Sequence, residues 1–193
     1  MSRHTNGGGR IYDDAEISTL AYFDRASVAR AHTKIRSGHF FNSAILGSTL
    51  CAGDVDITDS TLDCHSVAGQ AVVLRCQLGR GVEVYDRAKL SDVTLVGDVK
   101  VYGDAQLIGQ WSLSTGYGAR VHAGVWERPP RVHKFLRFPV NECAPGRVHV
   151  GCRCRTIEEW LEHYPEVARR MKWSPEEVKE LISVLEAWGS PTQ

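Results

Sequence analysis

The sequence has no excess of charge of either sign, because 23 Lys and Arg residues balance 23 Asp and Glu residues. A non-specific nucleic-acid binder needs a basic excess and a protein mimic of DNA needs an acidic one, so we expect neither class. No run of 18 apolar residues occurs, so we expect no transmembrane helix. The first ten residues, MSRHTNGGGR, lack the apolar core of a signal peptide. The 193 residues therefore predict a soluble globular protein of one domain, or of one domain with an appendage.

Nucleotide-binding and hydrolase motifs are also missing. The chain contains no Gly-x-Gly-x-x-Gly, no Gly-x4-Gly-Lys-Ser/Thr and no Gly-x-Ser-x-Gly. Glycines in such motifs let the backbone approach a phosphate, or make the sharp turn under a nucleophilic serine. The run Gly7-Gly8-Gly9 has no such context. We expect residues 1–10 to form a flexible N-terminus.

The cysteines do not indicate a disulfide framework. An even number of cysteines has that meaning in short secreted chains, whereas this chain shows no export signal and is long enough to bury a core without covalent staples. We therefore expect reduced thiols and a cytoplasmic location. The six cysteines are Cys51, Cys64, Cys76, Cys143, Cys152 and Cys154.

A short repeat between residues 71 and 113 decides the fold class. Each unit has a small or β-branched residue, then any residue, then a branched apolar residue, and a new unit begins every five or six residues. Three units span 17 residues, so equivalent positions align in successive rounds. The aligned sets are Ala71, Ala88 and Ala105; Val73, Leu90 and Leu107; Val67, Val84 and Val101; and Leu78 and Leu95.

This spacing predicts an all-β fold, a parallel β-helix of about six or seven coils over residues 11–126. A short strand every five or six residues closes a triangular coil in three steps, and each coil hydrogen-bonds to the next. A globular helix would need apolar residues at i, i+3, i+4 and i+7. An antiparallel sandwich would need strands roughly 8–12 residues apart. The repeat fits neither alternative.

The expected corners of the coils carry residues that tolerate a bent or left-handed backbone. Aspartates recur every six residues, at Asp86, Asp92, Asp98 and Asp104. Glycines lie beside three of these turns, at Gly97, Gly103 and Gly109. Earlier coils are less regular, and their repeat pairs are expected at Ala15/Ile17, Ala26/Val28, Thr33/Ile35 and Val55/Ile57.

The pattern ends at Pro129-Pro130, and residues 127–189 are expected to form a C-terminal cap of a β-hairpin and two short α-helices. Arg131–Phe138 and Arg147–Cys152 are β-prone, and Pro145-Gly146 lies in the connection between them. These features predict the hairpin. Residues 190–193 form a tail.

Both helices have start signals. Thr156 with Glu159 makes a capping box, and Pro165 interrupts or restarts this first helix. Ser174 caps the second helix, which ends at Gly189. We expect its apolar stripe to bury against the open end of the β-helix and so to block edge-to-edge aggregation, with docking of a partner as the alternative. The stripe consists of Val178, Leu181, Ile182, Leu185 and Trp188.

Thiols and imidazoles near the hairpin form the candidate metal site, because two thiolates with two imidazoles can hold zinc. The spacing argues against it. Cys-x-Cys is not the usual Cys-x2–4-Cys arrangement, and Cys152 and Cys154 would point the same way on a strand. We favour cysteines buried as small apolar residues, and expect no metal and no cofactor. The candidates are Cys143, His149, Cys152, Cys154 and His163.

Outward aromatic residues form the candidate binding surface. Tyr85 and Tyr102 both follow an inward valine and lie 17 residues apart, so they should stack on successive coils, with His122 next along. Such a ladder can dock a protein, form a subunit interface or stack bases. The alternative is that it only stabilises the stacking of coils. The large ring of Trp111, at a position filled elsewhere by Ala, Val or Cys, should bulge the last coil or pack against the cap.

The sequence resembles a group of small phage and prophage proteins. The features that carry the resemblance are the β-helix, a short strand that ends in Gly151-Cys152, and the segment Thr156–Trp160, which reads TIEEW. The N-terminal parts of those proteins match hexapeptide-repeat proteins that are acyltransferase-like or polymer-forming. The resemblance implies a left-handed coil, a phage origin and a role in interaction with the host, such as inhibiting a defence component.

Hexapeptide-repeat acyltransferases, which the repeat resembles, are usually trimers that bind acyl donors between subunits and use a histidine as general base. The resemblance implies His39 or His122 as the base. General-base catalysis also needs an orienting carboxylate and an acceptor pocket, and the sequence shows neither. We therefore favour a protein without catalytic residues.

From the sequence we favour a non-enzymatic β-solenoid that binds or inhibits a bacterial protein, which could belong to a defence system, in the cytoplasm of the host cell. The partner would contact Tyr85, Tyr102 and His122, and the chain would form a homo-oligomer, a dimer or a trimer. We expect neither a membrane nor a nucleic-acid partner. The alternatives are an acyltransferase that uses acyl-CoA, and an oligomer that binds a small nucleotide at a subunit interface.

Overall fold

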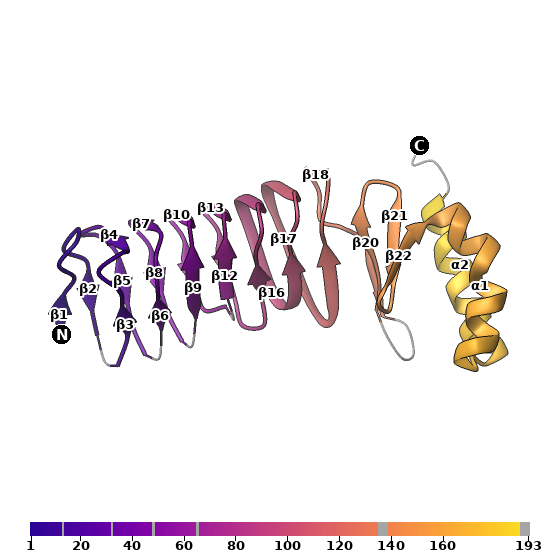
Figure 1. Cartoon of the computed structure of the whole chain (residues 1–193). Coiled ribbons are helices and arrows are strands. Elements are labelled where there is room, and N and C mark those ends of the chain that lie inside the picture. The colour runs from indigo at the N-terminus through magenta and orange to yellow at the C-terminus, as the bar shows by residue number, and fades with distance from the viewer. Residues whose placement is uncertain (13, 32, 48, 65, 135–138, 190–193) are drawn as a thin grey trace.

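The computed structural model describes residues 1–189 except 13, 32, 48, 65 and 135–138. The chain forms a solenoid, followed in line by a small sheet and two helices (Figure 1). The predicted fold class, a parallel β-helix of about six or seven coils capped by a C-terminal hairpin and two helices, is confirmed, and the solenoid has about seven coils. The predicted tail at 190–193, and residues 135–138 of the predicted hairpin, lie outside the described residues.

The strands of the solenoid belong to one sheet of 18 strands. β1 pairs antiparallel with β2, and the other pairings between described strands of this sheet are parallel. The strand bounds are β1 (Ser2–Arg3), β2 (Arg10–Ile11), β3 (Glu16–Ile17), β4 (Tyr22–Phe23), β5 (Val28–Ala29), β6 (Lys34–Ile35), β7 (His39–Phe41), β8 (Ala44–Ile45), β9 (Leu50–Gly53), β10 (Asp56–Thr58), β11 (Thr61–Leu62), β12 (Ser66–Gly69), β13 (Val72–Leu74), β14 (Gln77–Leu78), β15 (Glu83–Val84), β16 (Lys89–Val101), β17 (Gln106–Val121) and β18 (Val125–Trp126).

Three strands make one coil, as the three-step repeat predicts. β2 pairs with β5, β5 with β8, and β8 with β11, so each strand meets the strand three places further along the chain. Val73 lies opposite Leu90, which lies opposite Leu107. Val67, Val84 and Val101 form a second such row. The 17-residue register of the sequence is therefore the register of the coils.

The core of the first coils is partly polar, which corrects one predicted pair. Ser27 and Ala29 point inward in place of the expected Ala26 and Val28. Buried hydroxyls are tolerated because they are hydrogen-bonded: Ser27 Oγ accepts from the backbone of Ser43, and Ser43 Oγ from the backbone of Ser60. Because serine fills these inward positions, the sequence has no apolar repeat here that would show which residues point inward.

The corners adopt the left-handed backbone that the Asp and Gly residues allow. Asp86 and Asp92 have φ of 60° and 61°, and Gly97 and Gly103 have φ of 90° and 64°. Gly69 combines a φ of 79° with close packing, because a Cβ there would lie 2.7 Å from the carbonyl oxygen of Asp86 on the next coil. Only glycine fits such a corner without displacing the neighbouring backbone.

The last coil is wider than the others. Ser91 pairs with Ile108 but Val93 pairs with Trp111, so two residues of β17 lie opposite one residue of β16. This irregularity is a β-bulge. It lies directly before Trp111, where the large ring was expected to bulge the coil. The indole Nε1 of Trp111 donates to the carbonyl of Ile108 at 3.0 Å.

The N-terminal end turns back on the first coil. β1 pairs with β2 across the run Gly7–Gly9, within the residues that we expected to be flexible. The ring of His4 is buried and bonds the carbonyl oxygens of Asn6 and Ser18 at 2.9 and 3.0 Å. These contacts cover one open edge of the solenoid.

The predicted hairpin is present within a larger element, a four-stranded antiparallel sheet that follows the solenoid. Its strands, in spatial order, are β19 (Val132–Lys134), β20 (Pro139–Ala144), β21 (Arg147–Val150) and β22 (Arg153–Thr156). The turn at Pro145-Gly146 joins β20 to β21. β20 escaped prediction because its buried residues Asn141 and Glu142 are polar. Both are hydrogen-bonded: Glu142 accepts from Arg128 and Arg131, and the amide of Asn141 donates to the carbonyl of Glu142. Asn141 also donates to the carbonyl of Arg120.

Two helices complete the cap, which we define as β19–β22 with α1 (Ile157–Met171) and α2 (Pro175–Gly189). Both predicted helix starts are capped: Glu159 N donates to Thr156 Oγ1 at 3.1 Å, and Ser174 N donates to Glu177 Oε2 at 2.7 Å. Helix α1 continues through Pro165, which corrects the expected break. Burial of Trp160 before the proline and of Val167 after it offsets the lost hydrogen bond.

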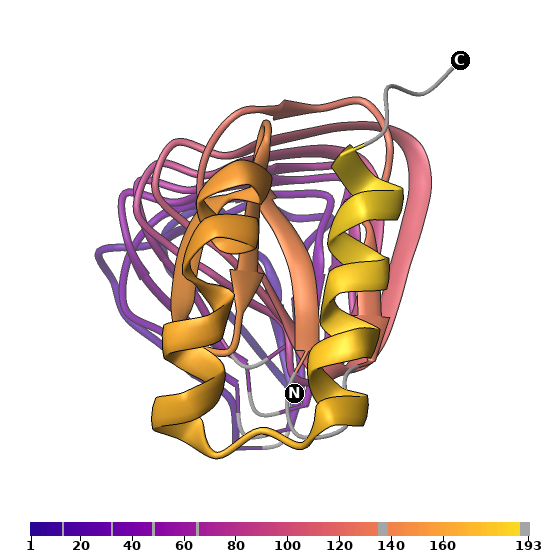
Figure 2. The ribbon, with the colours of Figure 1, turned by 90° about the vertical axis from the view of Figure 1, so that its right-hand side faces the viewer.

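The helices pack on the small sheet and not directly on the end of the β-helix, which corrects our prediction. They lie side by side over that end of the molecule, with the coils behind (Figure 2). Leu181 and Leu185 of α2 share a core with Val140 and Val148 of the sheet, separate from the solenoid core. Neither described helix is long and apolar enough to cross a membrane.

Candidate functional site at the junction of solenoid and cap

Three outward rings form a ladder at the C-terminal end of the solenoid, which we call the aromatic ladder: Tyr85, Tyr102 and His122. The rings of Tyr85 and Tyr102 stack with centroids 5.2 Å apart and planes 13° apart. His122 follows with its centroid 5.6 Å from that of Tyr102. Each ring follows an inward valine, so the 17-residue spacing brings the two tyrosines together as predicted. Burial raises the pKa of both phenols.

Backbone hydrogen bonds hold the three ring-bearing residues at equivalent positions of neighbouring coils. Tyr85 N donates to the carbonyl of Val101 at 3.0 Å, and Tyr102 N donates to that of Val121 at 2.9 Å. His122 N donates at 2.9 Å to the carbonyl of Cys143, which belongs to β20 of the cap. The backbone of the cap therefore continues the row of hydrogen bonds that joins the coils.

Charged side chains border the ladder. Lys100 Nζ lies 2.9 Å from Glu83 Oε1, and Lys100 lies opposite Arg120 on the next strand. Burial, followed by the positive charge of Arg147, lowers the pKa of His122. Arg120 acts in the same direction on His149. The end of the ladder nearest the cap is thus the more cationic end.

Four of the chemically reactive side chains meet beside this end, and we call them the Cys/His cluster: His122, Cys143, His149 and Cys154. One ligand atom from each lies within 4.8 Å of the others. The sequence pointed to Cys143, His149 and Cys154, but it assigned His122 to other roles. Local spacing contains no signal for His122, because its place in the cluster depends on how the cap docks.

Two other metal candidates are not in this cluster. Cys152 lies exposed in the turn after β21 and is not on a strand with Cys154, so the expectation that the two point the same way was wrong. His163 lies on α1, where its Nδ1 is 2.9 Å from the carbonyl oxygen of Glu159.

His39, the other candidate general base, does have a carboxylate beside it. Its Nδ1 lies 3.1 Å from Asp56 Oδ1, one coil further along. The side chains of His39 and Asp56 are 62% and 55% exposed. The pair therefore faces open solvent, whereas general-base catalysis needs a pocket that holds the acceptor.

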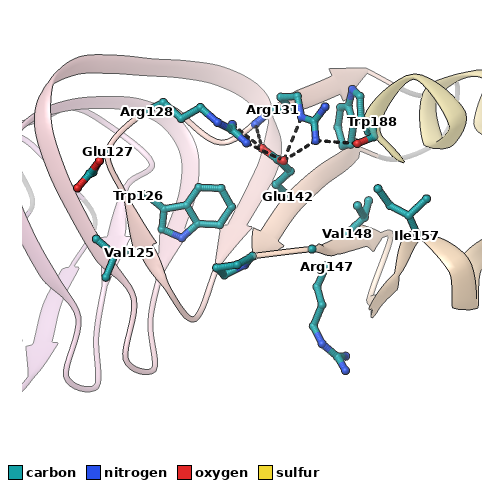
Figure 3. Close-up of a pocket in the computed structure, with 12 residues that line it drawn as sticks. Val125, Trp126, Glu127, Arg128, Arg131, Glu142, Arg147, Val148, Ile157 and Trp188 are labelled. Carbon is teal, nitrogen blue, oxygen red and sulfur yellow. Dashed lines mark hydrogen bonds and ion pairs between the residues drawn. The ribbon is translucent and has the colours of Figure 1, made fainter. Parts of the chain in front are cut away.

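A buried carboxylate holds the cap to the solenoid at a cavity of about 320 Å³ (Figure 3). Glu142 is 7% exposed and accepts hydrogen bonds from both Arg128 and Arg131, with Nη1 of Arg128 at 2.8 Å and Nη2 of Arg131 at 2.8 Å. Burial would raise the pKa of Glu142, but the hydrogen bonds from the two arginines outweigh it and lower the pKa to about 2. We call these three residues the arginine clamp, which sequence reasoning missed.

Aromatic rings support the clamp from both sides. The Arg128 guanidinium lies 5.9 Å from the ring of Trp126 on the solenoid, and the Arg131 guanidinium lies 5.0 Å from the ring of Trp188 on α2. Arg131 Nη2 also donates to the carbonyl of Trp188 at 3.1 Å. The clamp therefore connects the last coil, the small sheet and the second helix, and its charges are used within the fold.

Comparisons with known protein families, with curated proteins and with solved structures found no match to this chain.

Proposed function

We propose that this chain is a non-enzymatic β-solenoid interaction protein that docks a partner protein on the aromatic ladder. The observation that carries the proposal is the stack of Tyr85 on Tyr102, 5.2 Å apart on neighbouring coils. Tyrosines are enriched in the contact residues that dominate binding energy, because each supplies a large rigid apolar face and a polar tip. Backbone bonds on every rung hold these rings in place before a partner arrives, which lowers the entropic cost of binding.

The charges beside the ladder define the chemistry of the partner. Lys100, Arg120 and Arg147 lie along the side that leads to His122. A complementary partner presents an apolar or aromatic contact for the tyrosines next to an acidic patch for the arginines. The resemblance of the sequence to phage and prophage β-helix proteins supports a bacterial host protein as this partner. The complex would then form in the cytoplasm, where thiols stay reduced.

The positions of the two candidate bases favour binding over catalysis. His39 and Asp56 face open solvent on the early coils, and His122 packs between Tyr102 and His149. The contact between His39 and Asp56 is the observation that supports the acyltransferase alternative. That alternative predicts that acetyl-CoA or another acyl-CoA raises the melting temperature of the protein, and that His39→Ala removes the effect.

The test is affinity capture from a bacterial lysate with three forms of the chain. They are the wild type, the double variant Tyr85→Ala/Tyr102→Ala, and Phe41→Ala as the matched control. Phe41 is an outward aromatic residue, 41% exposed, in a row of stacked strands (β7, β10, β13) different from the row that leads to Tyr85 (β12, β15). Circular dichroism melting of each form shows that the coils remain folded.

We expect a protein that binds the wild type and Phe41→Ala in stoichiometric amount and is lost from the double variant. Its retention should fall as salt rises, because charge complementarity is screened. Equal capture by all three folded forms would overturn the assignment of the ladder. Light scattering that shows a dimer for the wild type and a monomer for the double variant would also overturn it, since the ladder would then be a contact between copies of this chain.

A further inference from the structure

We propose that the Cys/His cluster is a structural zinc site that joins the last coil of the solenoid to the cap. Its four residues come from four different segments. His122 follows β17, Cys143 lies in β20, His149 in β21 and Cys154 in β22. One donor atom from each lies within 4.8 Å of the other three.

The backbone brings these residues together in two pairs. His149 and Cys154 are cross-strand partners in the register of β21 and β22. His122 and Cys143 are joined by the hydrogen bond from His122 N to the Cys143 carbonyl, at 2.9 Å. The two pairs then meet through their side chains, with Cys143 Sγ 2.6 Å from Cys154 Sγ. The ring centroids of His122 and His149 lie 5.8 Å apart.

The imidazoles of the cluster have unused nitrogen atoms. Within the described ranges, Nδ1 and Nε2 of His149 and Nδ1 of His122 are buried and have no hydrogen-bond partner. His149 as a residue is 6% exposed. A buried polar atom without a partner costs free energy, and the large majority of such atoms in folded proteins are satisfied. A metal ion bound between the rings and the thiols would provide the missing partner for one nitrogen of each ring.

The type of donor selects the metal. Two thiols and two imidazoles match the Cys2His2 set of tetrahedral zinc sites, with Zn–S of about 2.3 Å and Zn–N of about 2.0 Å. With all four positions filled by the protein, such a site is structural and leaves no open position for a substrate. A Cys143–Cys154 disulfide is the competing arrangement, and it would leave the imidazole nitrogens without partners.

Protonation and charge are compatible with zinc. Burial, as the largest cause, lowers the pKa of His149 to about 4, so its ring is neutral at pH 7 and can donate a lone pair. Burial raises the pKa of the Cys143 thiol, and zinc binding would release that proton because a coordinated thiol is deprotonated. Two thiolates neutralise the charge of Zn²⁺. The neutral site can therefore lie near Arg120 and Arg147 without a large electrostatic penalty.

The site has a consequence for the ladder. Coordination would fix the ring of His122 and remove it as a general base. One ligand directly follows β17 of the solenoid, and the other three lie on strands of the cap. The metal would therefore link the cap to the last coil, in addition to the arginine clamp. This inference does not depend on a partner binding to the ladder.

The test measures metal in the full chain after removal of any affinity tag. We expect one zinc per wild-type chain by elemental analysis, and a Co²⁺-loaded form with the absorption bands of a tetrahedral thiolate site. The zinc content should fall from one per chain in the wild type to none in Cys154→Ser. Cys152→Ser, the matched control outside the cluster, should keep one zinc per chain. Because Cys154→Ser changes the packing of the cap as well as the ligand set, the wild type is also stripped with a chelator, which should lower the melting temperature until zinc is restored.

Three results would overturn the proposal. The first is wild-type protein that binds no zinc after it is reduced and supplied with the ion. The second is equal loss of zinc from Cys152→Ser. The third is peptide mapping that finds a Cys143–Cys154 disulfide in protein purified without added oxidant and supplied with zinc. The capture experiment on the ladder uses other residues and a different readout, so failure of one proposal is distinguishable from failure of the other.

Discussion

The backbone N–H of His122, the residue that follows the long strand β17, donates to the carbonyl oxygen of Cys143 in the cap at 2.9 Å. This bond joins two parts of the molecule that have separate apolar cores. It also places the last ring of the aromatic ladder beside the thiols of the cap. The aromatic ladder, the Cys/His cluster and the arginine clamp therefore meet at one junction.

The register of the solenoid predicts a strong effect at Val84 and a weak one at Val96. Val84 is fully buried between Val67 and Val101, so Val84→Asp would place an unpaired carboxylate in the core. We expect a loss of several kcal/mol, about 3 or more, in the free energy of unfolding. Val96 is 42% exposed on the same part of the solenoid, so Val96→Asp should change stability by less than about 0.5 kcal/mol. Denaturant unfolding measures both. A Val84→Asp protein that unfolds like the wild type would show that the register is wrong.

The corner glycines provide a second test of the coil geometry. Gly69→Ala would put a Cβ 2.7 Å from the Asp86 carbonyl oxygen at a φ of 79°. We expect it to cost about 1–3 kcal/mol, since a strained backbone and a contact with the next coil combine. In the part of the chain that the structure describes, a Cβ at Gly116 meets nothing within 4 Å, so Gly116→Ala is the control and should be neutral. Thermal melts that rank the two variants in the opposite order would contradict the account of the corners.

The arginine clamp predicts that the buried carboxylate stabilises the cap. Glu142→Gln keeps the size of the side chain but removes the charge that Arg128 and Arg131 share. Both arginines are partly exposed and can regain water, so we expect a moderate loss of about 1–3 kcal/mol. Glu166→Gln, on the exposed side of α1, should be nearly neutral.

Hydrogen exchange can localise the effect of Glu142→Gln. Protection should fall in β20–β22 and the helices, and should persist in the early coils, because neighbouring coils hold one another. Uniform loss of protection along the whole chain would mean that the cap and the solenoid unfold as one unit.

Thiol reactivity should separate the cysteines by their places in the fold. Cys152 is exposed and should be alkylated first in the native protein. Burial raises the pKa of Cys64 to about 12 and that of Cys76 to about 11, so both should stay unreactive at pH 8 until the chain unfolds. Peptide mapping after brief iodoacetamide treatment measures the order. Early modification of Cys64 in folded protein would contradict its place inside the solenoid.

The solenoid was predictable from the sequence because its physics is local and periodic. Each inward position meets its equivalent one coil away, so Val73, Leu90 and Leu107 repeat in the sequence as they do in space. Prediction of the phase failed at Ala26 and Val28, where hydrogen-bonded serine fills the inward position. Small polar residues can fill inward positions when their hydroxyls are hydrogen-bonded to the backbone, and they leave no apolar repeat in the sequence.

The junction was less predictable because its contacts are not periodic. The stacking of Tyr85 on Tyr102 follows from the repeat, and the structure shows it. The meeting of His122 with Cys154 depends on the packing of a cap whose strand β20 is polar at two buried positions. Neither the clamp on Glu142 nor the place of His122 in the cluster has a spacing that sequence reasoning can find.

Site-specific photo-crosslinking asks directly whether a partner docks on the aromatic ladder. A benzophenone amino acid replaces Tyr102 in one form of the chain and Phe41 in another, and bacterial cells that express each form are irradiated. We expect one crosslinked protein adduct from position 102 and none from position 41. Adducts from position 41 alone, or no adduct from position 102 in a chain shown to be folded, would contradict it.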